Sequence, residues 1–307
     1  MLNQPVLLII YKRIDTTLKV IDSLRKNGVT KLYIASNWPC NKNEFEIVQN
    51  CRKTIEQNID WNCDVKFLYR KEYLTPKESI PDAINWFFSN EEMGIILEDD
   101  CVPNDVFYTF CDHLLNKYKN LSSIGMISGN NFQQDNKNYI NPNSYYLSNI
   151  FHIWGWATWR DRWLVYGKFP NKFSEIVTIL DLLYNSDRKS YRYWFNIYFD
   201  VFFNKAPSWD YYWSLSNVCA QRCSIIPQFN LVTNIGFGND ATFTTDINDP
   251  NSNLATKEME SVNVDPNELT ISKDYDAYTQ KHHYLTGGIR QYTKYMVNKL
   301  LLLIYEK

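Results

Sequence analysis

Three adjacent carboxylic acids, Glu98-Asp99-Asp100, follow directly on the apolar run Gly94–Leu97. Burial at the end of such a run disfavours the charged form of each acid. A divalent cation would offset this cost, and Mg²⁺ and Mn²⁺ prefer carboxylate and water oxygens that they often share with substrate phosphates. The segment therefore predicts a metal site for a nucleoside diphosphate. A solvated acidic turn is the alternative interpretation, supported by Asp105 at the start of the next helix.

Asp210 is a second carboxylate whose neighbours suggest chemistry. It lies between Trp209 and the run Tyr211-Tyr212-Trp213. Desolvation by these aromatic side chains would raise its pKa, as a general base for a sugar hydroxyl requires. The alternative is a helix cap that accepts backbone N–H groups where a helix begins near Tyr211. Asp240 is the reserve candidate for the base.

The composition excludes several classes of protein. Of the 307 residues, 45% are hydrophobic and 21% are charged, so neither a disordered nor a fibrous chain fits. The net charge of −2 argues against nucleic-acid binding over a broad surface, because such domains carry a strong basic excess. Aromatic residues reach 16%, and although most fill cores, some are available to stack on sugars.

The cysteines and apolar runs bear on the cellular setting. The 7 cysteines include no CxxC pair and no zinc-type spacing, which favours a reduced, cytoplasmic environment. The apolar runs Val6–Ile10 and Leu300–Ile304 fall far short of the ~20 residues that span a bilayer. We therefore expect no integral membrane segment.

The elements that must position the acids alternate between strands and helices. Strands are predicted at Val6–Ile10, Lys31–Ala35, Val65–Tyr69, Gly94–Leu97 and Ile124–Ser128. Helices are predicted at Thr16–Arg25, on the face of Phe45, Val48, Cys51 and Ile55, and at Ile80–Phe88 and Asp105–Tyr118. This order implies right-handed βαβ units and a parallel, buried sheet, the α/β class. Ligands of such sheets bind beyond the carboxyl ends of the strands, where Glu98-Asp99-Asp100 follows.

The pattern changes from about residue 150. Trp154–Arg160 opens an aromatic-rich region, with helices expected around Ser174–Tyr184 and Trp209–Ala220. Asp246–Glu268 is rich in Asn, Asp, Pro and Ser, which is typical of a long surface loop. No GxGxxG or GxxxxGK[ST] motif follows any predicted strand, so a nucleotide would have to be bound without the usual glycine-rich loops.

The segment Gly94–Pro103, followed by an aromatic-rich helix, resembles the metal-binding DxD-type segment of GT-A glycosyltransferases. It is most similar to the Glu-Asp-Asp form in N-acetylglucosaminyltransferase I and related bacterial sugar transferases. Further segments resemble that family in the same order along the chain: Pro5–Leu24, Ile127–Phe132, Trp154-Gly155-Trp156, Ser208–Trp213 and Asn230–Thr244. The resemblance therefore covers about residues 5 to 245.

The resemblance implies a GT-A (nucleotide-diphospho-sugar transferase) fold, with a mostly parallel central sheet flanked by helices and a C-terminal helical extension. Residues 1–245 would form the catalytic domain, with a nucleotide-sugar-binding half up to about 130 and an acceptor half over 131–245. Residues 246–307 would form a polar loop and the C-terminal helical extension.

Site residues are implied at the matching positions. Asp100 would bind Mn²⁺ or Mg²⁺, and Asp210 would be the catalytic base. The donor would contact Tyr11, Arg13, Asn37, Glu98 and Asp99, whereas Gly155, Trp156 and Trp209 would contact the sugar or acceptor. Two positions depart from the family, which has an acid in place of Asn37 and a second acid in place of Tyr211. Arg13, Arg160 and Arg162 could help the departing diphosphate, with structural ion pairs as the alternative.

The implied activity is metal-dependent transfer of a sugar from a nucleoside-diphosphate donor, expected to be a UDP-sugar, to a hydroxyl of an acceptor glycan. The transfer would invert the anomeric centre and would serve bacterial surface polysaccharide or glycoconjugate synthesis, with a lipid-linked glycan as one form of acceptor. A nucleotidyltransferase of similar fold and a non-catalytic carbohydrate-binding protein are the alternatives.

The C-terminal segment Ile289–Tyr305 predicts an amphipathic helix. Ile289, Tyr292, Met296, Leu300 and Leu303 fall on one side, and the cations Arg290, Lys294 and Lys299 fall mostly away from it. Such a helix suits the headgroup region of an anionic inner leaflet, which would place the protein peripherally at the cell membrane. Packing on the catalytic domain or on a second subunit is the alternative.

Overall fold

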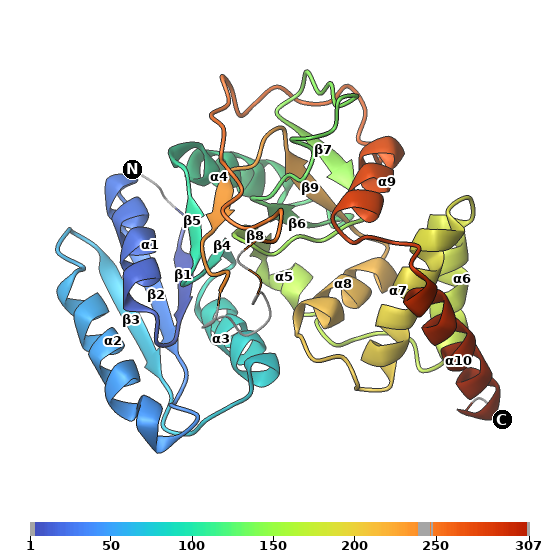
Figure 1. Ribbon diagram of the computed structural model, residues 1–307. Helices are drawn as coiled ribbons and strands as arrows, with labels where there is room; N and C mark the ends of the chain where they lie inside the picture. Colours follow the sequence, from blue (N-terminus) through green and yellow to red (C-terminus); the bar gives the residue numbers. More distant parts are fainter. Residues whose placement is uncertain (1–3, 239–245, 247, 306–307) are drawn as a thin grey trace.

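The computed structural model describes residues 4–238, 246 and 248–305 of the chain. A mixed sheet runs through the centre of the molecule, with helices on both of its faces (Figure 1). In the described part of the chain this sheet has eight strands in the order β3-β2-β1-β4-β8-β6-β9-β7. They are β1 (Val6–Ile10), β2 (Lys31–Ser36), β3 (Asp64–Tyr69), β4 (Met93–Glu98), β6 (Ile124–Ser128), β7 (Tyr145–Ser148), β8 (Trp156–Trp159) and β9 (Cys223–Pro227).

Most neighbouring strands of this sheet are parallel. Strands β3, β2, β1 and β4 pair in parallel, and so do β6 and β9. Strand β8 is antiparallel to both β4 and β6 and joins the two groups, and β7 is antiparallel to β9 at the edge. The expected α/β class, with a mostly parallel sheet flanked by helices, is confirmed.

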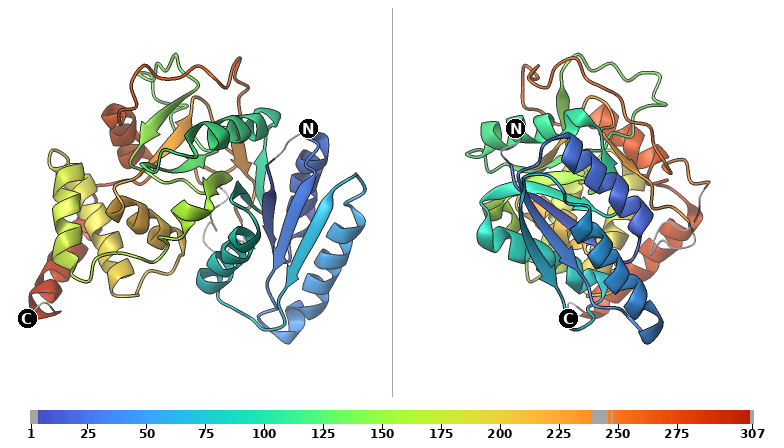
Figure 2. Two further views of the ribbon diagram at one scale, coloured as in Figure 1. Left: turned by 180° about the vertical axis from the view of Figure 1, so that it is seen from behind. Right: turned by 90° about the vertical axis from the view of Figure 1, so that its left-hand side faces the viewer.

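Two layers of helices cover the sheet (Figure 2). The helices are α1 (Ile14–Lys26), α2 (Phe45–Gln57), α3 (Pro76–Asn90), α4 (Asp105–Tyr118), α5 (Arg160–Trp163), α6 (Phe173–Tyr184), α7 (Arg188–Phe202), α8 (Asp210–Cys219), α9 (Lys273–His282) and α10 (Ile289–Tyr305), with a 3-10 turn η1 (Lys42–Glu44) before α2. One hydrophobic core lies under α1, α2 and α4, and the other lies under α3 and α5 to α8. Strand β1 contributes to both, because Val6 and Leu8 point into the first and Leu7 into the second. This explains why the central strands β1 and β4 are continuous apolar runs rather than alternating ones, whereas the outer strand β3 has no buried residue.

A second, two-stranded sheet lies beside the end of β4. Strand β5 (Cys101–Pro103) pairs with β10 (Val232–Asn234) in antiparallel register, so that Asn234 is opposite Cys101. The backbone N–H of Ile235 donates to the Asp100 carbonyl at 2.9 Å. This pairing fixes a segment from late in the chain against the three-acid segment.

The elements predicted over the first 130 residues are all present, with one clear difference in length. Helix α3 begins at Pro76, four residues before the predicted start at Ile80. Its start is set by Pro76 in the first turn and by Glu78, which accepts the Thr75 backbone N–H at 3.0 Å. The short strands β5, β7, β8, β9 and β10, the helices α5, α7 and α9 and the turn η1 are additional to the prediction.

The C-terminal extension packs on the residues before it. As expected for a surface loop, the described residues between Asp246 and Glu268 contain neither helix nor strand. After them Asp276 of α9 accepts hydrogen bonds from the Ser148 hydroxyl and from the Asn149 N–H, the latter at 2.9 Å. Helix α10 packs along α7 and ends away from the N-terminus (Figure 1). Within the described residues, none of the helices combines the length and the apolarity that crossing a bilayer demands.

Candidate active site

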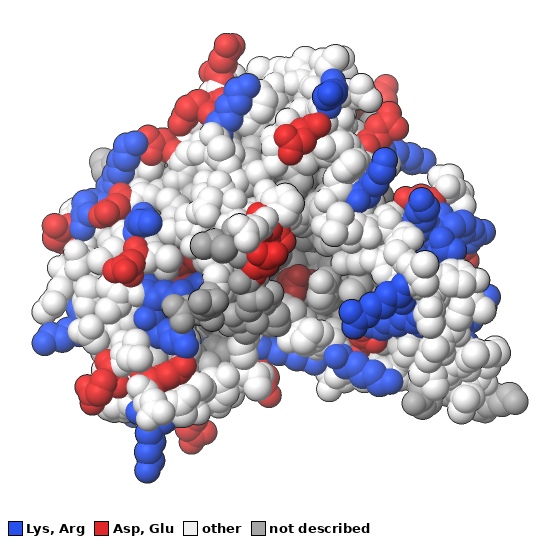
Figure 3. Space-filling model, viewed as in Figure 1, with Lys and Arg blue, Asp and Glu red and all other residues white. Residues whose placement is uncertain are grey.

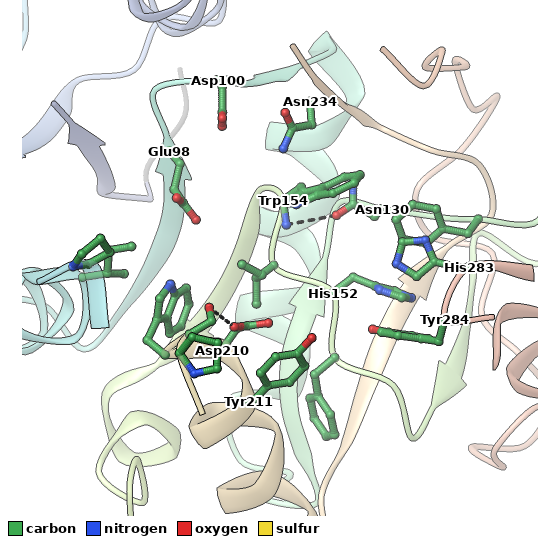
Figure 4. Close-up of a pocket in the computed structure, with 18 of the residues that line it drawn as sticks. Glu98, Asp100, Asn130, His152, Trp154, Asp210, Tyr211, Asn234, His283 and Tyr284 are labelled. Atoms are coloured by element: carbon green, nitrogen blue, oxygen red, sulfur yellow. Dashed lines mark hydrogen bonds between the residues drawn. The ribbon is translucent and has the colours of Figure 1, made fainter. Parts of the chain in front are cut away.

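A cavity of about 500 Å³ lies beyond the carboxyl end of β4, between this strand and the start of α8 (Figure 4). The residues that meet in it come from all parts of the chain. Those labelled in Figure 4 are Glu98, Asp100, Asn130, His152, Trp154, Asp210, Tyr211, Asn234, His283 and Tyr284. A space-filling view shows acidic side chains inside a hollow at the centre of the same face (Figure 3).

The guanidinium of Arg13 holds two of the three adjacent acids. Its Nη2 forms ion pairs with Asp99 and, at 2.8 Å, with Oδ2 of Asp100. Asp99 also accepts the Tyr11 backbone N–H at 3.2 Å and does not line the cavity, whereas Asp100 does. Asp99 therefore fixes Arg13 and the end of β1, which leaves Asp100 as the acid of this pair that can meet a ligand.

Glycine is required at position 236 by the same acid. A Cβ at this position would lie 1.9 Å from Oδ2 of Asp100 and 2.6 Å from Nη1 of Arg13. The Gly236 N–H is held by Oδ1 of Asn234 at 2.8 Å, so the backbone passes close to the carboxylate without covering it with a side chain.

The charges of the acid segment are not balanced by protein cations. Among the described residues that line the cavity, Arg13 is the only Lys or Arg, against Glu98, Asp100 and Asp210. Burial, followed by the nearby charges of Asp100 and Asp99, raises the pKa of Glu98. A divalent cation at Asp100 would relieve this repulsion, and carboxylate oxygen is a ligand that Mn²⁺ and Mg²⁺ accept, so the residues fit such an ion.

The protein alone does not supply a full set of metal ligands in the described part of the chain. No group of three or more His, Cys, Asp or Glu side chains there is arranged to hold an ion. An ion bound through Asp100 would therefore draw its remaining ligands from phosphate and water oxygens, as is common for Mg²⁺.

Asp210 is the first residue of α8 and faces the cavity (Figure 4). Trp209 is the N-cap residue of this helix, and the Asp210 carboxylate, one position later, also accepts hydrogen bonds from the backbone N–H groups of Asp210 and Tyr211 at the helix start. Its Oδ1 accepts a hydrogen bond from the Ser208 hydroxyl. Burial raises the pKa of Asp210, and the Ser208 bond acts in the opposite direction. The side chain is thus oriented, desolvated and more basic than an ordinary aspartate.

The far wall of the cavity is aromatic and uncharged. His283 stacks on Phe132 with ring centroids 3.8 Å apart, and His152 lies edge-on to both. Burial lowers the pKa of His283 to about 4, and burial followed by the His283 charge lowers that of His152. Both imidazoles are therefore neutral at pH 7, when each offers one N–H donor and one acceptor nitrogen. With Tyr284 alongside, this wall suits a ligand rich in hydroxyl groups.

Some predicted site residues lie outside the cavity. Trp156 is fully buried in β8 and packs against Trp209 and Trp213, so of these three only Trp209 lines the cavity. Gly155 has φ +70° and lies against Val232, where it lets the chain turn into β8.

The predicted donor residues at the ends of β1 and β2 are engaged within the protein. The Asn37 amide donates to the Leu74 carbonyl at 2.6 Å, and its oxygen accepts the Trp38 N–H at 2.9 Å. The Tyr11 hydroxyl donates to Glu44 and accepts the Cys40 N–H at 2.9 Å. Beside Tyr11 lies a second hollow lined by Trp38, Pro39, Cys40, Asn41, Lys42 and Phe45.

Two of the three candidate arginines are structural. Arg162 is 2% exposed and donates to the carbonyls of Ile124 and Lys119. Arg160 donates to the Glu91 carbonyl at 2.9 Å. Arg13 alone of the three lines the cavity. The reserve base Asp240 lies outside the described residues.

Several cavity residues were not predicted from the sequence. Asn130 and Asn234 lie in segments that the resemblance singled out, and both end or follow a strand. His152, His283 and Tyr284 belong to no recognisable motif, and the His282-His283 pair lacks the spacing of metal ligands. The run His282-His283-Tyr284 precedes the predicted amphipathic helix Ile289–Tyr305 in the sequence, but this proximity does not indicate a binding site.

Comparison with known proteins identifies no family. No family model and no curated protein matches the sequence. The structure overlaps partly with that of HddC from Yersinia pseudotuberculosis, at 9% identity and a TM-score of 0.32 over 52% of this chain and 77% of that one. It overlaps with 4-diphosphocytidyl-2C-methyl-D-erythritol synthase from Anaerococcus prevotii at 9% identity and a TM-score of 0.34, over 58% of this chain and 84% of that one. The overlap with UDP-glucose pyrophosphorylase complexed with UDP-glucose has 10% identity and a TM-score of 0.37, over 74% of this chain and 90% of that one. These overlaps are too low to carry an argument about function.

Proposed function

We propose that this chain is a metal-dependent GT-A glycosyltransferase that moves a sugar from a nucleoside-diphosphate donor, expected to be a UDP-sugar, to a hydroxyl of an acceptor glycan. One observation carries the proposal. A single cavity is lined by Glu98 and Asp100 at the end of β4 and, from α8 more than 100 residues later, by the half-buried carboxylate of Asp210. A metal ligand and a base on opposite sides of one cavity are what such a transfer needs.

Each acid has a separate role in the proposed reaction. Asp100 would hold Mn²⁺ or Mg²⁺, which would neutralise charge on the leaving diphosphate. Arg13 keeps Asp99 and Asp100 in place through its ion pairs and lies at the cavity wall, where its guanidinium would meet phosphate oxygens. The nucleoside would lie toward Tyr11 and Asn37, beside the hollow of Trp38 and Phe45.

Asp210 would take the proton of the acceptor hydroxyl as that oxygen attacks the anomeric carbon. Its raised pKa makes it a stronger base, and Ser208 fixes its orientation. The bond to the diphosphate breaks as the new glycosidic bond forms, so one displacement inverts the anomeric centre. The acceptor sugar would lie on the neutral wall of His152, His283 and Tyr284.

Nucleotidyl transfer is the second candidate, and the UDP-glucose pyrophosphorylase named above is an enzyme of that class. In that reaction a phosphate oxygen attacks a nucleoside triphosphate, so the two substrates bring several negative charges and need no base. A cavity with Arg13 as its only described Lys or Arg, and with Asp210 facing inward, suits a less charged pair of substrates. A non-catalytic carbohydrate-binding protein would need neither acid.

The released product separates the three functions. The chain is first screened by thermal shift against nucleotide sugars and nucleoside triphosphates with and without Mn²⁺, because at equal concentration a ligand that binds the folded state more tightly raises Tm more. The best donor is then incubated with glycan acceptors. Release of a nucleoside diphosphate that Asp210→Asn abolishes supports the proposal. Release of pyrophosphate establishes the second candidate, and metal-independent glycan binding without turnover establishes the third.

A further inference from the structure

Helix α10 has one face that belongs to the fold. Its Tyr295 ring packs on Phe195 of α7 with centroids 4.9 Å apart, and Asn298 is buried with its amide donating to Oδ1 of Asn196 at 3.0 Å. Leu301 and Leu302 pack against the same core. The helix is therefore held on α7, and the packing alternative considered for it is correct for this face.

The opposite face of α10 is an apolar strip open to solvent. Its six members, each at least 43% exposed, are Ile289, Met296, Val297, Leu300, Leu303 and Ile304. At 100° per residue they fall within an arc of about 120° opposite Asn298. Apolar side chains that gather in this way on a monomer mark an interaction surface. The packing of α10 on α7 therefore does not account for this exposed apolar strip.

Cationic side chains border this strip on both sides. In the helical projection Lys299 flanks one edge, and Arg290 and Lys294 flank the other. Helix α7 adds Arg192, whose guanidinium lies over the Tyr292 ring at 5.2 Å. Residues 288–305 contain no acid, and Lys and Arg side chains gather on the side of the molecule where α7 and α10 lie (Figure 3). Lys294 pairs with Asp200 of α7, but among the described residues Arg290 and Lys299 have no acidic partner.

We propose that α10 docks the protein on an anionic phospholipid surface, with the apolar strip in the headgroup region and the helix axis in the membrane plane. The charge pattern selects this occupant: cations at the borders of an apolar face meet lipid phosphates at the depth where the face is buried. A symmetric dimer through the same strip would instead bring the cations of two copies together. This inference is independent of the proposed function.

Docking would place the cavity near the membrane. His283 and Tyr284 line the cavity, and α10 begins five residues later at Ile289. One continuous segment therefore joins the wall proposed for the acceptor to the membrane surface, so an acceptor carried on a lipid would be presented close to that wall.

Substitutions on the strip test this better than truncation, because removal of α10 would also uncover Tyr191 and Phe195. The full chain is mixed with vesicles of phosphatidylcholine alone or with 30% phosphatidylglycerol, and binding is measured by co-sedimentation. The strip variant is Leu300→Asn with Leu303→Asn. The matched control is Leu182→Asn, a leucine of α6 that is 77% exposed. The charge variant is Arg290→Gln with Lys299→Gln.

The wild type and the control should bind the anionic vesicles at least tenfold more strongly than the neutral ones. The strip variant should lose this binding with Tm unchanged within about 2 °C, because exposed sites contribute little to stability. The charge variant should bind the anionic vesicles roughly fivefold more weakly for each cation removed, and added salt should likewise weaken vesicle binding by the wild type. Equal binding of the strip variant and the wild type, or none by the wild type, overturns the proposal. A dimer that the strip variant dissociates, without vesicle binding, would assign the strip to a second copy.

Discussion

Asp99 and Asp100 are neighbours with different surroundings, and the difference defines their tasks. Asp99 is bound by Arg13 and by the Tyr11 N–H, whereas Asp100 shares Arg13 but keeps its place in the cavity wall. Cys101 adds a weak S–H donor to Oδ1 of Asp100 at 3.3 Å. A substitution at Asp100 should therefore change ligand binding, and one at Asp99 should disturb the folded end of β1.

Asp100→Asn should reduce Mn²⁺-dependent binding of UDP at least tenfold. The amide keeps the shape of the side chain but loses the charge that would hold the cation. Isothermal titration with UDP, with and without Mn²⁺, measures the effect. Asp105→Asn, at an exposed acid paired with Lys26, is the control and should bind as the wild type does. Unchanged affinity in a folded Asp100→Asn variant would remove the metal assignment.

Asp210→Asn should keep the affinity for the donor and lower kcat by roughly the 10²–10⁴-fold that proton transfer to a base contributes. The amide retains the hydrogen bond from the Ser208 hydroxyl, so the start of α8 should be preserved. Initial rates at saturating donor give kcat, and titration gives the affinity. A fall in donor affinity with kcat unchanged would show that Asp210 binds the donor instead.

Ser208→Ala should move the pH dependence of kcat upward. The Ser208 hydroxyl lowers the pKa of Asp210, against burial, which raises it. The base works when deprotonated, so kcat rises as pH passes through this pKa, and loss of the hydroxyl shifts that rise to higher pH. Profiles of kcat from pH 4 to 8 for both proteins measure the shift. Superimposed profiles would mean that Asp210 is not the group that titrates.

Residue chemistry pointed to Asp100 and Asp210 separately, and the resemblance added Arg13 and joined the three in one predicted site. Acids at a strand end and an acid among aromatics are local signals, and each is found in the cavity. His283 and Tyr284 could not be found this way, because what brings them to the site is the packing of α9 on the sheet. Asn37 shows the converse: its type suits a ligand, but its amide is bonded to Trp38 and Leu74.

At the scale of elements, the turn into β8 is fixed by Gly155. This residue has φ +70°, and a Cβ there would lie 2.8 Å from Cγ2 of Val232 in β10. Its carbonyl accepts the Gly129 N–H at 2.7 Å, which ties the end of β6 to the start of β8. The position therefore constrains both the conformation and the space of the chain.

Gly155→Ala should lower the free energy of unfolding by about 2–4 kcal/mol, from left-handed strain and from crowding at Val232. Gly167→Ala separates the two causes, since Gly167 has φ +71° with nothing within 4 Å of its Cβ position. Gly167→Ala should lower the free energy of unfolding by the backbone strain alone, about 1–2 kcal/mol. Urea unfolding of the three proteins gives the values. An equal loss in both variants would show that the packing around Gly155 can yield.

The predictability of an element depends on its length and on where its partners are. Helices α1 to α4 and strands β1 to β4 carry their pattern within one segment, so periodicity located them. Strand β8 has four residues, all buried, and its pairing with β4 and β6 is the only sign of its type. Helix α7 could have been predicted, because Tyr191, Trp194, Phe195, Tyr198 and Phe199 recur at helical spacing.

At the scale of the whole molecule, the C-terminal extension is joined to the sheet by a buried acid. Burial raises the pKa of Asp276 to about 7, against hydrogen bonds from Ser148 and Asn149 that lower it. The folded state thus keeps a proton that the unfolded chain loses near pH 4. Its contribution to stability is complete below pH 4, falls as pH rises to about 7 and is constant above.

Asp276→Asn should therefore remove a pH dependence of stability. Between pH 5 and 7 the free energy of unfolding of the wild type, relative to the variant, should fall by up to about 1.4 kcal/mol per pH unit. Urea unfolding at several pH values measures it. Asp274→Asn, at an exposed acid on the same helix, is the control for loss of a carboxylate from α9. A difference that stays constant with pH for Asp276→Asn would show that this acid is ionised when folded.

The arrangement of the whole chain is the part that the sequence did not reveal. A polar loop and a helix after residue 246 were expected, but their packing depends on contacts such as Ser148 with Asp276, 128 residues apart. Contacts between residues so far apart produce no periodic pattern in the sequence. The cavity wall proposed for the acceptor depends on them, so the sequence pattern did not predict it.

The position of β8 between β4 and β6 also determines when the sheet can be completed during synthesis of the chain. Strand β8 alone connects the β3-β2-β1-β4 group to the β6-β9-β7 group in the described chain, and it begins at Trp156. At ~5–20 residues per second, a ribosome completes β8 about 3–12 s after β4. Until then the edge of β4 has no neighbour, and its unpaired N–H and C=O groups can recruit a strand from another nascent chain. The acids of the proposed metal site thus emerge at the end of a strand whose edge is still unpaired, so the cavity can form only after β8 has covered that edge.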